Sequence, residues 1–224
     1  MRHDMPIVFV HGVSTSSAIW GHQVAAMRRL GHPCATVDLP GHGSMAEVRF
    51  TLETALAAID DAVRRFTTPP LLVGLSLGGY TSLAYAATNP GAVSGVVLSG
   101  CSTQIRGKPL GLFRRASTGA LRLLRHPRRA TWPLVTDMLQ AMQGYSCLDD
   151  IRRLDVPVWI VNGRWDVLRF GEWRLLAAQP TARHHVIRRA GHDVNSHAPV
   201  AFTRVLLEVV NQLRSAVPRV RPAH

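Results

Sequence analysis

Residues 73–82 read VGLSLGGYTS, in which residues 74–78 fit the pattern G-x-S-x-G and Gly79 adds a further glycine. Ser76 comes just after the apolar run PPLLVG, residues 69–74, which has the composition of a buried strand. The glycines either only turn the backbone, or they hold Ser76 in a strained, exposed conformation that suits a nucleophile. Small residues surround a serine often by chance, so the rest of the chain must supply the partners that a nucleophile needs.

Apolar, β-branched runs alternate with amphipathic helical patterns along the chain. The runs predict six strands, within residues 6–12, 34–43, 70–76, 93–100, 156–163 and 183–192. The helical patterns predict helices over residues 16–31, 52–66, 77–91, 168–180 and 198–215. This alternation predicts an α/β fold with a mostly parallel six-stranded sheet and helices on both faces. Ligands bind such sheets at the carboxyl ends of the strands, so the candidate functional residues are those just past each strand.

The length and composition indicate one domain. The 224 residues suit a single domain with a sizeable core, and a hydrophobic share of 46% excludes a disordered chain. No apolar run approaches the roughly 20 residues of a membrane-spanning helix, so we expect no integral membrane association. The start, MRHDMPIVFVHG, contains a proline and no small-residue cleavage site, which indicates a buried strand rather than a signal peptide. We therefore expect the protein in the cytoplasm.

The cysteines indicate the redox state of the compartment in which the protein works, and the net charge indicates which partners it could bind. Cys34, Cys101 and Cys147 form no C-x-x-C pattern, and an odd number cannot pair completely, so we expect reduced thiols. The formal net charge of +12 raises the question of a nucleic-acid or anionic partner. However, the only lysine is Lys108, and richness in arginine and alanine is also typical of genomic base composition. Without a helix-turn-helix, zinc-finger or RNP-type motif, we expect no nucleic-acid partner.

Residues 101–150 interrupt the alternation of strands and helices. They are helical, basic and apolar by turns, and residues 62–136 contain no Asp or Glu at all. We expect a helical cap here, inserted into a core of residues 1–100 and 151–215 that ends in a flexible tail over 216–224. The basic cap predicts a solvated cationic face, steering of anionic substrates, or contact with an anionic lipid surface. Its basic residues are Arg106, Lys108, Arg114, Arg115, Arg122, Arg125, Arg128 and Arg129.

Three residues just past predicted strands carry the side chains of a hydrolytic triad. A serine hydroxyl needs an adjacent base, and the base needs a group that orients it. Ser76, Asp166 in NGRWD and His192 in RRAGHD follow the chain order of the nucleophile-elbow enzymes. The alternatives are a buried turn serine, a loop-capping aspartate and a structural histidine. Asp193 is the rival acid and His197 the rival base. The spacing of His192, Asp193 and His197 does not suit a set of metal ligands.

The order of motifs along the chain resembles the α/β-hydrolase family. The matching motifs are HG at 11–12 followed by Trp20, DLPGHGSM at 38–45, GLSLGGYTSLAYAATNPGAVSGVVLSG at 74–100, LDVPVWIVNGRWD at 154–166 and AGHDVNSHAPVAF at 190–202. Together they cover most of residues 5–213. The resemblance implies an α/β-hydrolase fold with a small helical cap. Since the family carries a strand hairpin before its HG loop and this chain starts at the strand of that loop, we expect a sheet that is short at one edge.

The resemblance also implies a reaction. Ser76 would be the nucleophile, His192 the base and later the acid, and Asp166 the group that holds the imidazole. We expect hydrolysis of carboxylic esters with small to medium apolar groups, without a metal or an organic cofactor. The same triad would also support thioesterase, lactonase or C–C bond hydrolase activity, because fold does not determine function. A non-enzymatic binding module is disfavoured, since such relatives usually lack a member of the triad.

The oxyanion hole and the pocket follow from the same resemblance. The backbone N–H groups of Leu77 and Val13 would bind the oxyanion, with Ser14 as the alternative to Val13. Leu77 would begin a helix, whose unpaired N–H groups and positive dipole end favour a negative charge. Trp20 is expected to pack in the core. The residues expected to line the pocket are Trp165, Cys101 and Phe113, where packing remains the alternative for Trp165 and Cys101.

Overall fold

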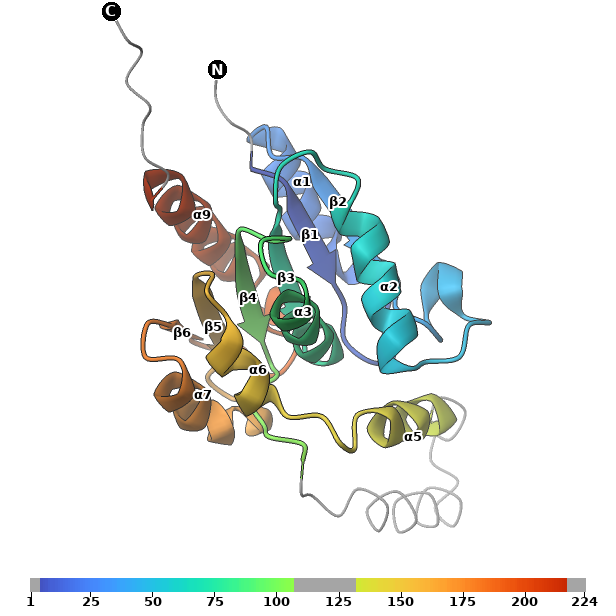
Figure 1. Ribbon diagram of the computed structural model, residues 1–224. Coiled ribbons are helices and arrows are strands. Elements are labelled where there is room, and N and C mark those ends of the chain that lie inside the picture. The colour runs from blue at the N-terminus through green and yellow to red at the C-terminus, as the bar shows by residue number, and fades with distance from the viewer. Residues whose placement is uncertain (1–4, 107–131, 217–224) are drawn as a thin grey trace, which may run out of the picture.

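A computed structural model describes residues 5–106 and 132–216 of the chain (Figure 1). Its centre is a six-stranded sheet in the order β2-β1-β3-β4-β5-β6, and every neighbouring pair of strands is parallel. The prediction of a parallel six-stranded sheet is confirmed. The strands are β1 (Ile7–Val10), β2 (Cys34–Val37), β3 (Leu71–Leu75), β4 (Gly95–Ser99), β5 (Val158–Gly163) and β6 (Arg183–Ile187).

Helices cover both faces of the sheet, as the sequence predicts. One face packs against α2 (Leu52–Val63), α3 (Leu77–Thr88), α6 (Cys147–Arg153) and α7 (Glu172–Ala178). The other face packs against α1 (Gly21–Arg29), α8 (Val194–His197) and α9 (Pro199–Ala216). The 3-10 helices are η1 (Ser17–Trp20), η2 (Gly43–Met45) and η4 (Val167–Gly171), and α5 (Trp132–Ala141) completes the described helices.

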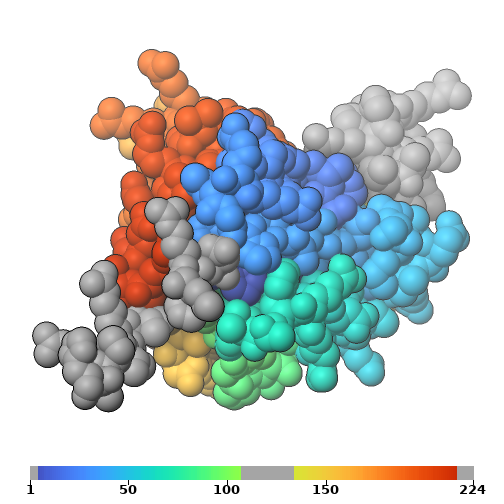
Figure 2. Space-filling view, turned by 90° about the horizontal axis from the view of Figure 1, so that it is seen from above, coloured from blue at the N-terminus to red at the C-terminus, as the bar shows by residue number. Residues whose placement is uncertain are grey.

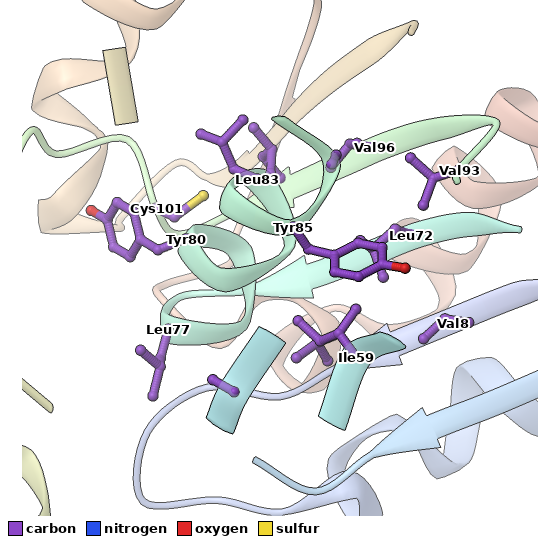
Figure 3. Close-up of a cluster of buried hydrophobic side chains, with 14 of the residues drawn as sticks. Val8, Ile59, Leu72, Leu77, Tyr80, Leu83, Tyr85, Val93, Val96 and Cys101 are labelled. Atoms are coloured by element: carbon purple, nitrogen blue, oxygen red, sulfur yellow. The ribbon is translucent and has the colours of Figure 1, made fainter. Parts of the chain in front are cut away.

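Alternating side chains of each strand enter the two cores. Val8 and Leu72 point to the face of α2 and α3, whereas Ile7 and Phe9 point to the face of α1 and α9. Figure 3 shows the first of these cores, with side chains of β1, β3 and β4 facing α2 and α3. Trp20 is fully buried in the second core, as predicted.

All six strands run in the same direction, so their carboxyl ends share one edge of the sheet. In Figure 1 the strands point downward, and α5, α6 and α7 lie at that lower end. Figure 2 shows the opposite end of the molecule, where the N-terminal part of the chain in blue lies between the orange and red of the C-terminal part and the teal of the segment before β3. The parallel sheet therefore brings together the residues that follow β1, β3, β4 and β5.

Part of the predicted cap falls within the described residues. α5 and the first half of α6 belong to residues 101–150. The side chain of Leu134 in α5 contacts Gly41, which follows β2. Phe113 and all the basic cap residues except Arg106 lie outside the described residues, as does the tail over 217–224. In the described parts of the chain, no helix combines the length and the hydropathy that crossing a membrane requires.

The glycines of the G-x-S-x-G stretch allow α3 to pack directly on the sheet. A Cβ on Gly78 would lie 2.3 Å from the carbonyl oxygen of Val10 and 2.5 Å from that of His11. A Cβ on Gly74 would lie 2.3 Å from the carbonyl oxygen of Gly78. Both contacts are with backbone atoms, which cannot rotate away as a side chain can. Only glycine therefore fits where the start of α3 passes over β1 and β3.

We expect Gly78→Ala to destabilise the protein by about 3 kcal/mol, at the upper end of the usual cost of overpacking. The added methyl group must push α3 away from β1, because the carbonyl oxygen of Val10 occupies its position. The free energy of urea unfolding measures the effect. The matched control is Gly21→Ala, where nothing lies within 4 Å of the new Cβ. Equal stability of the two variants would contradict the packing argument.

Candidate active site

Ser76 lies in the sharp turn between β3 and α3. Its backbone has φ 54° and ψ −115°, a left-handed conformation that costs a non-glycine residue about 1–3 kcal/mol. The Ser76 amide donates a 2.7 Å hydrogen bond to the carbonyl oxygen of Ser99, the last residue of β4. Its hydroxyl forms no hydrogen bond with the described residues and does not cap α3. The turn therefore holds a half-buried serine, whose hydroxyl is unpaired within the described part of the chain, at the carboxyl edge of the sheet.

Asp166 lies in the turn after β5 and is almost completely buried, with 3% of its surface exposed. Its Oδ1 accepts a 2.8 Å hydrogen bond from the amide of Leu168, and its own amide donates to the carbonyl oxygen of Gly163. A buried carboxylate requires such partners, because transfer from water is costly without them. The local turn thus holds the carboxylate in one orientation.

His192 lies in the loop after β6 and points at Asp166. Its Nδ1 lies 3.1 Å from each carboxylate oxygen of Asp166. This hydrogen bond is the largest cause that raises the pKa of His192 above its usual range, and partial burial opposes it. The carboxylate orients Nδ1–H toward itself, which leaves Nε2 as the ring atom able to accept a proton.

The loop after β4 connects the serine and the histidine. Ser99 accepts the amide of Ser76, and the next residue, Gly100, lies against the imidazole of His192. A Cβ on Gly100 would lie 2.9 Å from Cε1 of His192, and Gly100 has φ +63°. Ser76 therefore contacts Ser99, and His192 contacts the next residue in the chain, Gly100. Any side chain at position 100 would displace the imidazole.

The two rival residues named from the sequence, His197 and Asp193, contact the loop of His192 in other ways than Asp166 does. His197 accepts a 3.1 Å hydrogen bond at Nδ1 from the amide of Gly191, so it holds the loop that carries His192. Asp193 raises the pKa of His192 only through its charge, with a smaller effect than Asp166. In residues 5–106 and 132–216, no group of three or more His, Cys, Asp or Glu side chains is arranged to hold a metal ion.

The loop after β1 lies beside Ser76. A Cβ on Gly12 would lie 3.3 Å from Cβ of Ser76. The Ser14 amide donates to Nε2 of His42 at 3.1 Å, whereas the amides of Val13 and Leu77 have no hydrogen-bond partner among the described residues. Of the two donors that the sequence leaves open in this loop, Val13 is the one whose N–H is not occupied in the described part of the chain.

Two buried histidines, His11 and His42, hold this loop, and the sequence analysis assigned neither of them a role. The Nδ1 of His11 donates to the carbonyl oxygen of Gly12 at 2.7 Å, and its Nε2 accepts from the amide of Leu39 at 3.0 Å. Burial lowers the pKa of His11 to about 4. Its ring packs edge-on against His42, which donates to the carbonyl oxygen of Pro40. His11 is therefore neutral at pH 7 and holds the backbone next to Val13.

Sequence reasoning also missed Asn162, which is completely buried at the end of β5. Its Oδ1 accepts from the amide of Gly100 at 2.9 Å. Its Nδ2 donates to Ser102 Oγ at 2.9 Å and to Glu172 Oε2 at 3.0 Å. Asn162 thereby ties the loop that supports His192 to the first turn of α7. The only signal in the sequence is a polar residue inside an apolar strand.

The residues expected to line the pocket lie in different environments. Cys101 is buried against α3, beside Gly79 and Tyr80 (Figure 3), which agrees with the packing alternative. Burial raises the pKa of its thiol well above the usual range, so it remains protonated. Trp165 lies next to Asp166 and is exposed, so it does not pack in the core. Phe113 lies outside the described residues.

We expect the pKa of the His192 imidazole to lie above its usual range, because its hydrogen bond to Asp166 stabilises the protonated form. An NMR titration of its Cε1 proton measures the midpoint. In Asp166→Asn the charge is lost, and partial burial of the ring then favours the neutral form, so the midpoint falls. An unchanged midpoint in this variant would contradict the coupling of the two side chains.

Comparisons with known proteins agree with this architecture. The sequence model described as the alpha/beta hydrolase family matches residues 7–205. A 2-succinyl-6-hydroxy-2,4-cyclohexadiene-1-carboxylate synthase of Enterobacter sp. (strain 638) is 26% identical over 248 residues, which cover 95% of this chain and 94% of the synthase. An esterase of Mycobacterium tuberculosis is 24% identical over 253 residues, which cover 91% of this chain and 80% of the esterase.

A solved structure has the same fold. The putative non-heme bromoperoxidase BpoC of Mycobacterium tuberculosis superposes with a TM-score of 0.75 and 22% sequence identity. The superposition covers 93% of this chain and 92% of the bromoperoxidase. At this identity the likeness concerns the fold alone.

Proposed function

This chain belongs to the alpha/beta hydrolase family of enzymes, and on that premise we propose that it is a serine hydrolase that cleaves carboxylic esters through an acyl-enzyme. The observation that carries the proposal is the hydrogen-bonded pair of Asp166 and His192, at the same sheet edge as the strained Ser76. Acyl transfer by a serine requires a base near the hydroxyl and a group that orients the base. Ser76 is the nucleophile in this proposal, His192 the base, and Asp166 the orienting acid.

The reaction has two half-reactions. Nε2 of His192 takes the hydroxyl proton of Ser76 while Oγ attacks the ester carbonyl carbon. The tetrahedral intermediate collapses, the bond to the alkoxy oxygen breaks, and His192 returns the proton to the departing alcohol. Water then attacks the acyl-enzyme, and His192 accepts one of its protons and returns it to Ser76 Oγ as the carboxylic acid leaves. Asp166 stabilises the imidazolium in both halves.

The negative charge of both tetrahedral intermediates requires hydrogen-bond donors. In the proposal these are the N–H groups of Leu77 and Val13, and their lack of other partners among the described residues supports this. Leu77 begins α3, so its N–H is one of the helix's orphan donors and lies at the positive end of the helix dipole. Each such donor contributes about 3 kcal/mol to transition-state stabilisation.

The substrate class depends on the predicted cap over residues 101–150. We propose that the cap covers the carboxyl edge of the sheet, and the contact of Leu134 with Gly41, beyond the end of β2, supports this. The cap sequence is rich in leucine, which favours small to medium apolar acyl or alcohol groups. The three cysteines form no disulfide, which fits a reducing compartment, and we therefore propose the cytoplasm.

A synthase activity is the second candidate. Several relatives that match this chain over nearly its full length carry the name of the same carboxylate synthase. A net charge of +12 would suit a substrate that carries carboxylates. The two candidates differ in one covalent step, because ester hydrolysis by the proposed route passes through an acyl group on Ser76. Trapping that acyl group separates them.

The proposal predicts that a fluorophosphonate probe labels Ser76, and that the protein turns over nitrophenyl esters in preference to the matching acyl thioesters. The probe reacts with a serine only when a base activates it. Mass spectrometry of the labelled peptide and kinetics on the paired substrates are the measurements. Faster turnover of thioesters would favour the thioesterase alternative. Absence of both labelling and turnover would favour a binding module.

A further inference from the structure

Exposed large apolar side chains lie on both sides of Asp166 in the chain. Trp165 is 70% exposed, Val167 71%, Phe170 81% and Trp173 63%. Leu168, between them, is 37% exposed. These five residues lie within nine positions of the chain, in the turn after β5, on η4 and on the first turn of α7. We call them the aromatic corner. A cluster of exposed large apolar side chains, unlike a single one, is typical of a surface that contacts a partner.

The local structure explains why these side chains cannot enter the core. η4 is a single 3-10 turn between β5 and α7, and none of its residues is buried. α7 buries Leu175 against the sheet, which directs Trp173 to the opposite side of the helix. In Figure 1, α7 lies at the same lower end of the molecule as the carboxyl ends of the strands. The aromatic corner therefore borders the candidate active site.

The surroundings of the aromatic corner are cationic. Arg174 stacks on the ring of Trp173, with its guanidinium carbon 5.2 Å from the ring centre. The amides of Arg164 and Trp165 donate to the carbonyl oxygens of Ile187 and Ala190, both at 2.9 Å. These bonds bring two further exposed arginines, Arg188 and Arg189, beside the aromatic corner.

The acidic side chains in the same segments are already engaged. Residues 163–174 and 187–190 contain two acids, Asp166 and Glu172. Asp166 is buried and bound to His192. Glu172 binds Arg169, Asn162 and His184. The surface that remains combines exposed aromatic rings with exposed arginines and no free carboxylate from these segments.

We propose that the aromatic corner and its arginines form a docking surface for an anionic lipid membrane. Tryptophan rings favour the interface between lipid headgroups and acyl chains, and phenylalanine enters the acyl region. Each arginine near an anionic bilayer adds about 1 kcal/mol of attraction. A membrane satisfies both features at once, since it offers an apolar layer beneath a layer of negative charge.

A second copy of the chain is a poorer partner for this surface. A twofold dimer places the same patch of both subunits face to face. The arginines of the patch would then oppose arginines, with no free carboxylate from the patch to separate them. Charge complementarity therefore favours a partner that is itself anionic.

The position of the surface has a consequence for the substrate, which rests on the proposed function. Trp165 adjoins Asp166 in the chain, so docking would place the lipid at the rim of the candidate active site, beside the edge that the proposed cap covers. Esters dissolved in the membrane would then reach Ser76 without crossing water. Docking itself does not depend on catalysis, and Ser76→Ala is expected to bind vesicles as the parent protein does.

The test compares vesicle binding of the parent protein with that of Phe170→Ser/Trp173→Ser. Co-sedimentation uses vesicles of phosphatidylcholine alone or mixed with phosphatidylglycerol, at low and at high salt. We expect the parent to bind the mixed vesicles, to bind neutral vesicles much more weakly, and to lose affinity at high salt. The double variant is expected to bind mixed vesicles at least about tenfold more weakly.

Leu30→Ser/Val200→Ser is the matched control, because it removes two exposed apolar side chains elsewhere on the surface. Both variants should retain the parent's thermal midpoint and its turnover of a water-soluble ester. The proposal is overturned if the parent protein does not bind mixed vesicles, if it binds neutral vesicles as tightly as mixed ones, or if the two double variants bind mixed vesicles with the same affinity. A concentration-dependent dimer that only Phe170→Ser/Trp173→Ser abolishes, without vesicle binding, would overturn it in favour of a second copy.

Discussion

Ser76→Ala is expected to lower kcat for ester hydrolysis by about 10⁵-fold, because the acyl-enzyme can no longer form. The remaining rate would come from binding and from the oxyanion donors, which the substitution leaves in place. Alanine loses only the hydroxyl oxygen, and that oxygen forms no hydrogen bond with the described residues. Initial rates on a nitrophenyl ester, with the thermal midpoint as a check on folding, measure the effect.

Ser82→Ala is the matched control for this variant. Ser82 lies in the same helix, α3, and its buried hydroxyl has no hydrogen-bond partner in the described part of the chain. Its removal should leave kcat unchanged, since the residue is remote from the turn that carries Ser76. Turnover retained by Ser76→Ala would exclude Ser76 as the nucleophile, whatever the control shows.

Asp166→Asn is expected to lower kcat by about 10⁴-fold with a much smaller change in KM. The amide has nearly the same shape as the carboxylate, so the buried turn should persist. It carries no charge to stabilise the imidazolium, and its NH₂ group can favour the wrong tautomer of His192. The pH profile of kcat/KM adds a second readout. Its acidic limb, where His192 loses its proton, should move to lower pH as the pKa of His192 falls.

Asp193→Asn separates the two acids near His192. Asp193 affects the pKa of His192 through its charge alone, so its loss should cost less than about tenfold in kcat. A larger loss in Asp193→Asn than in Asp166→Asn would reverse the assignment of the orienting acid. This comparison requires no assumption about the natural substrate.

The elements of the fold could be predicted because their signals are local. The apolar runs around Leu71–Leu75 and Val158–Gly163 are β3 and β5, and both strands are buried throughout. Boundaries differ from the predictions by a few residues, as at α2, which ends at Val63 rather than at residue 66. The predicted cap over residues 101–150 remains a prediction, because residues 107–131 lie outside the described part of the chain.

The candidate site could be predicted only in part. Ser76, Asp166 and His192 were identifiable because each follows a strand, and parallel strands end at a common edge. The choice between Val13 and Ser14 remained open, because it depends on His42, which is 28 residues away from Ser14 and accepts its amide. The neutral state of His11 could not be predicted from the sequence either, since it results from burial and from the hydrogen bond with the amide of Leu39.

The sequence alone determined the order of strands and helices along the chain, and it made Ser76, Asp166 and His192 candidates because each lies just past a strand. The order of elements depends on periodicity, which acts over a few residues, and the candidates depend on short motifs at the ends of strands. The tertiary structure alone decided that Asn162 ties Gly100 to α7, across 62 residues, and that Trp165, Phe170 and Trp173 remain in water. Such features depend on which distant segments meet, because burial and hydrogen bonding belong to the packed chain rather than to any short stretch of it.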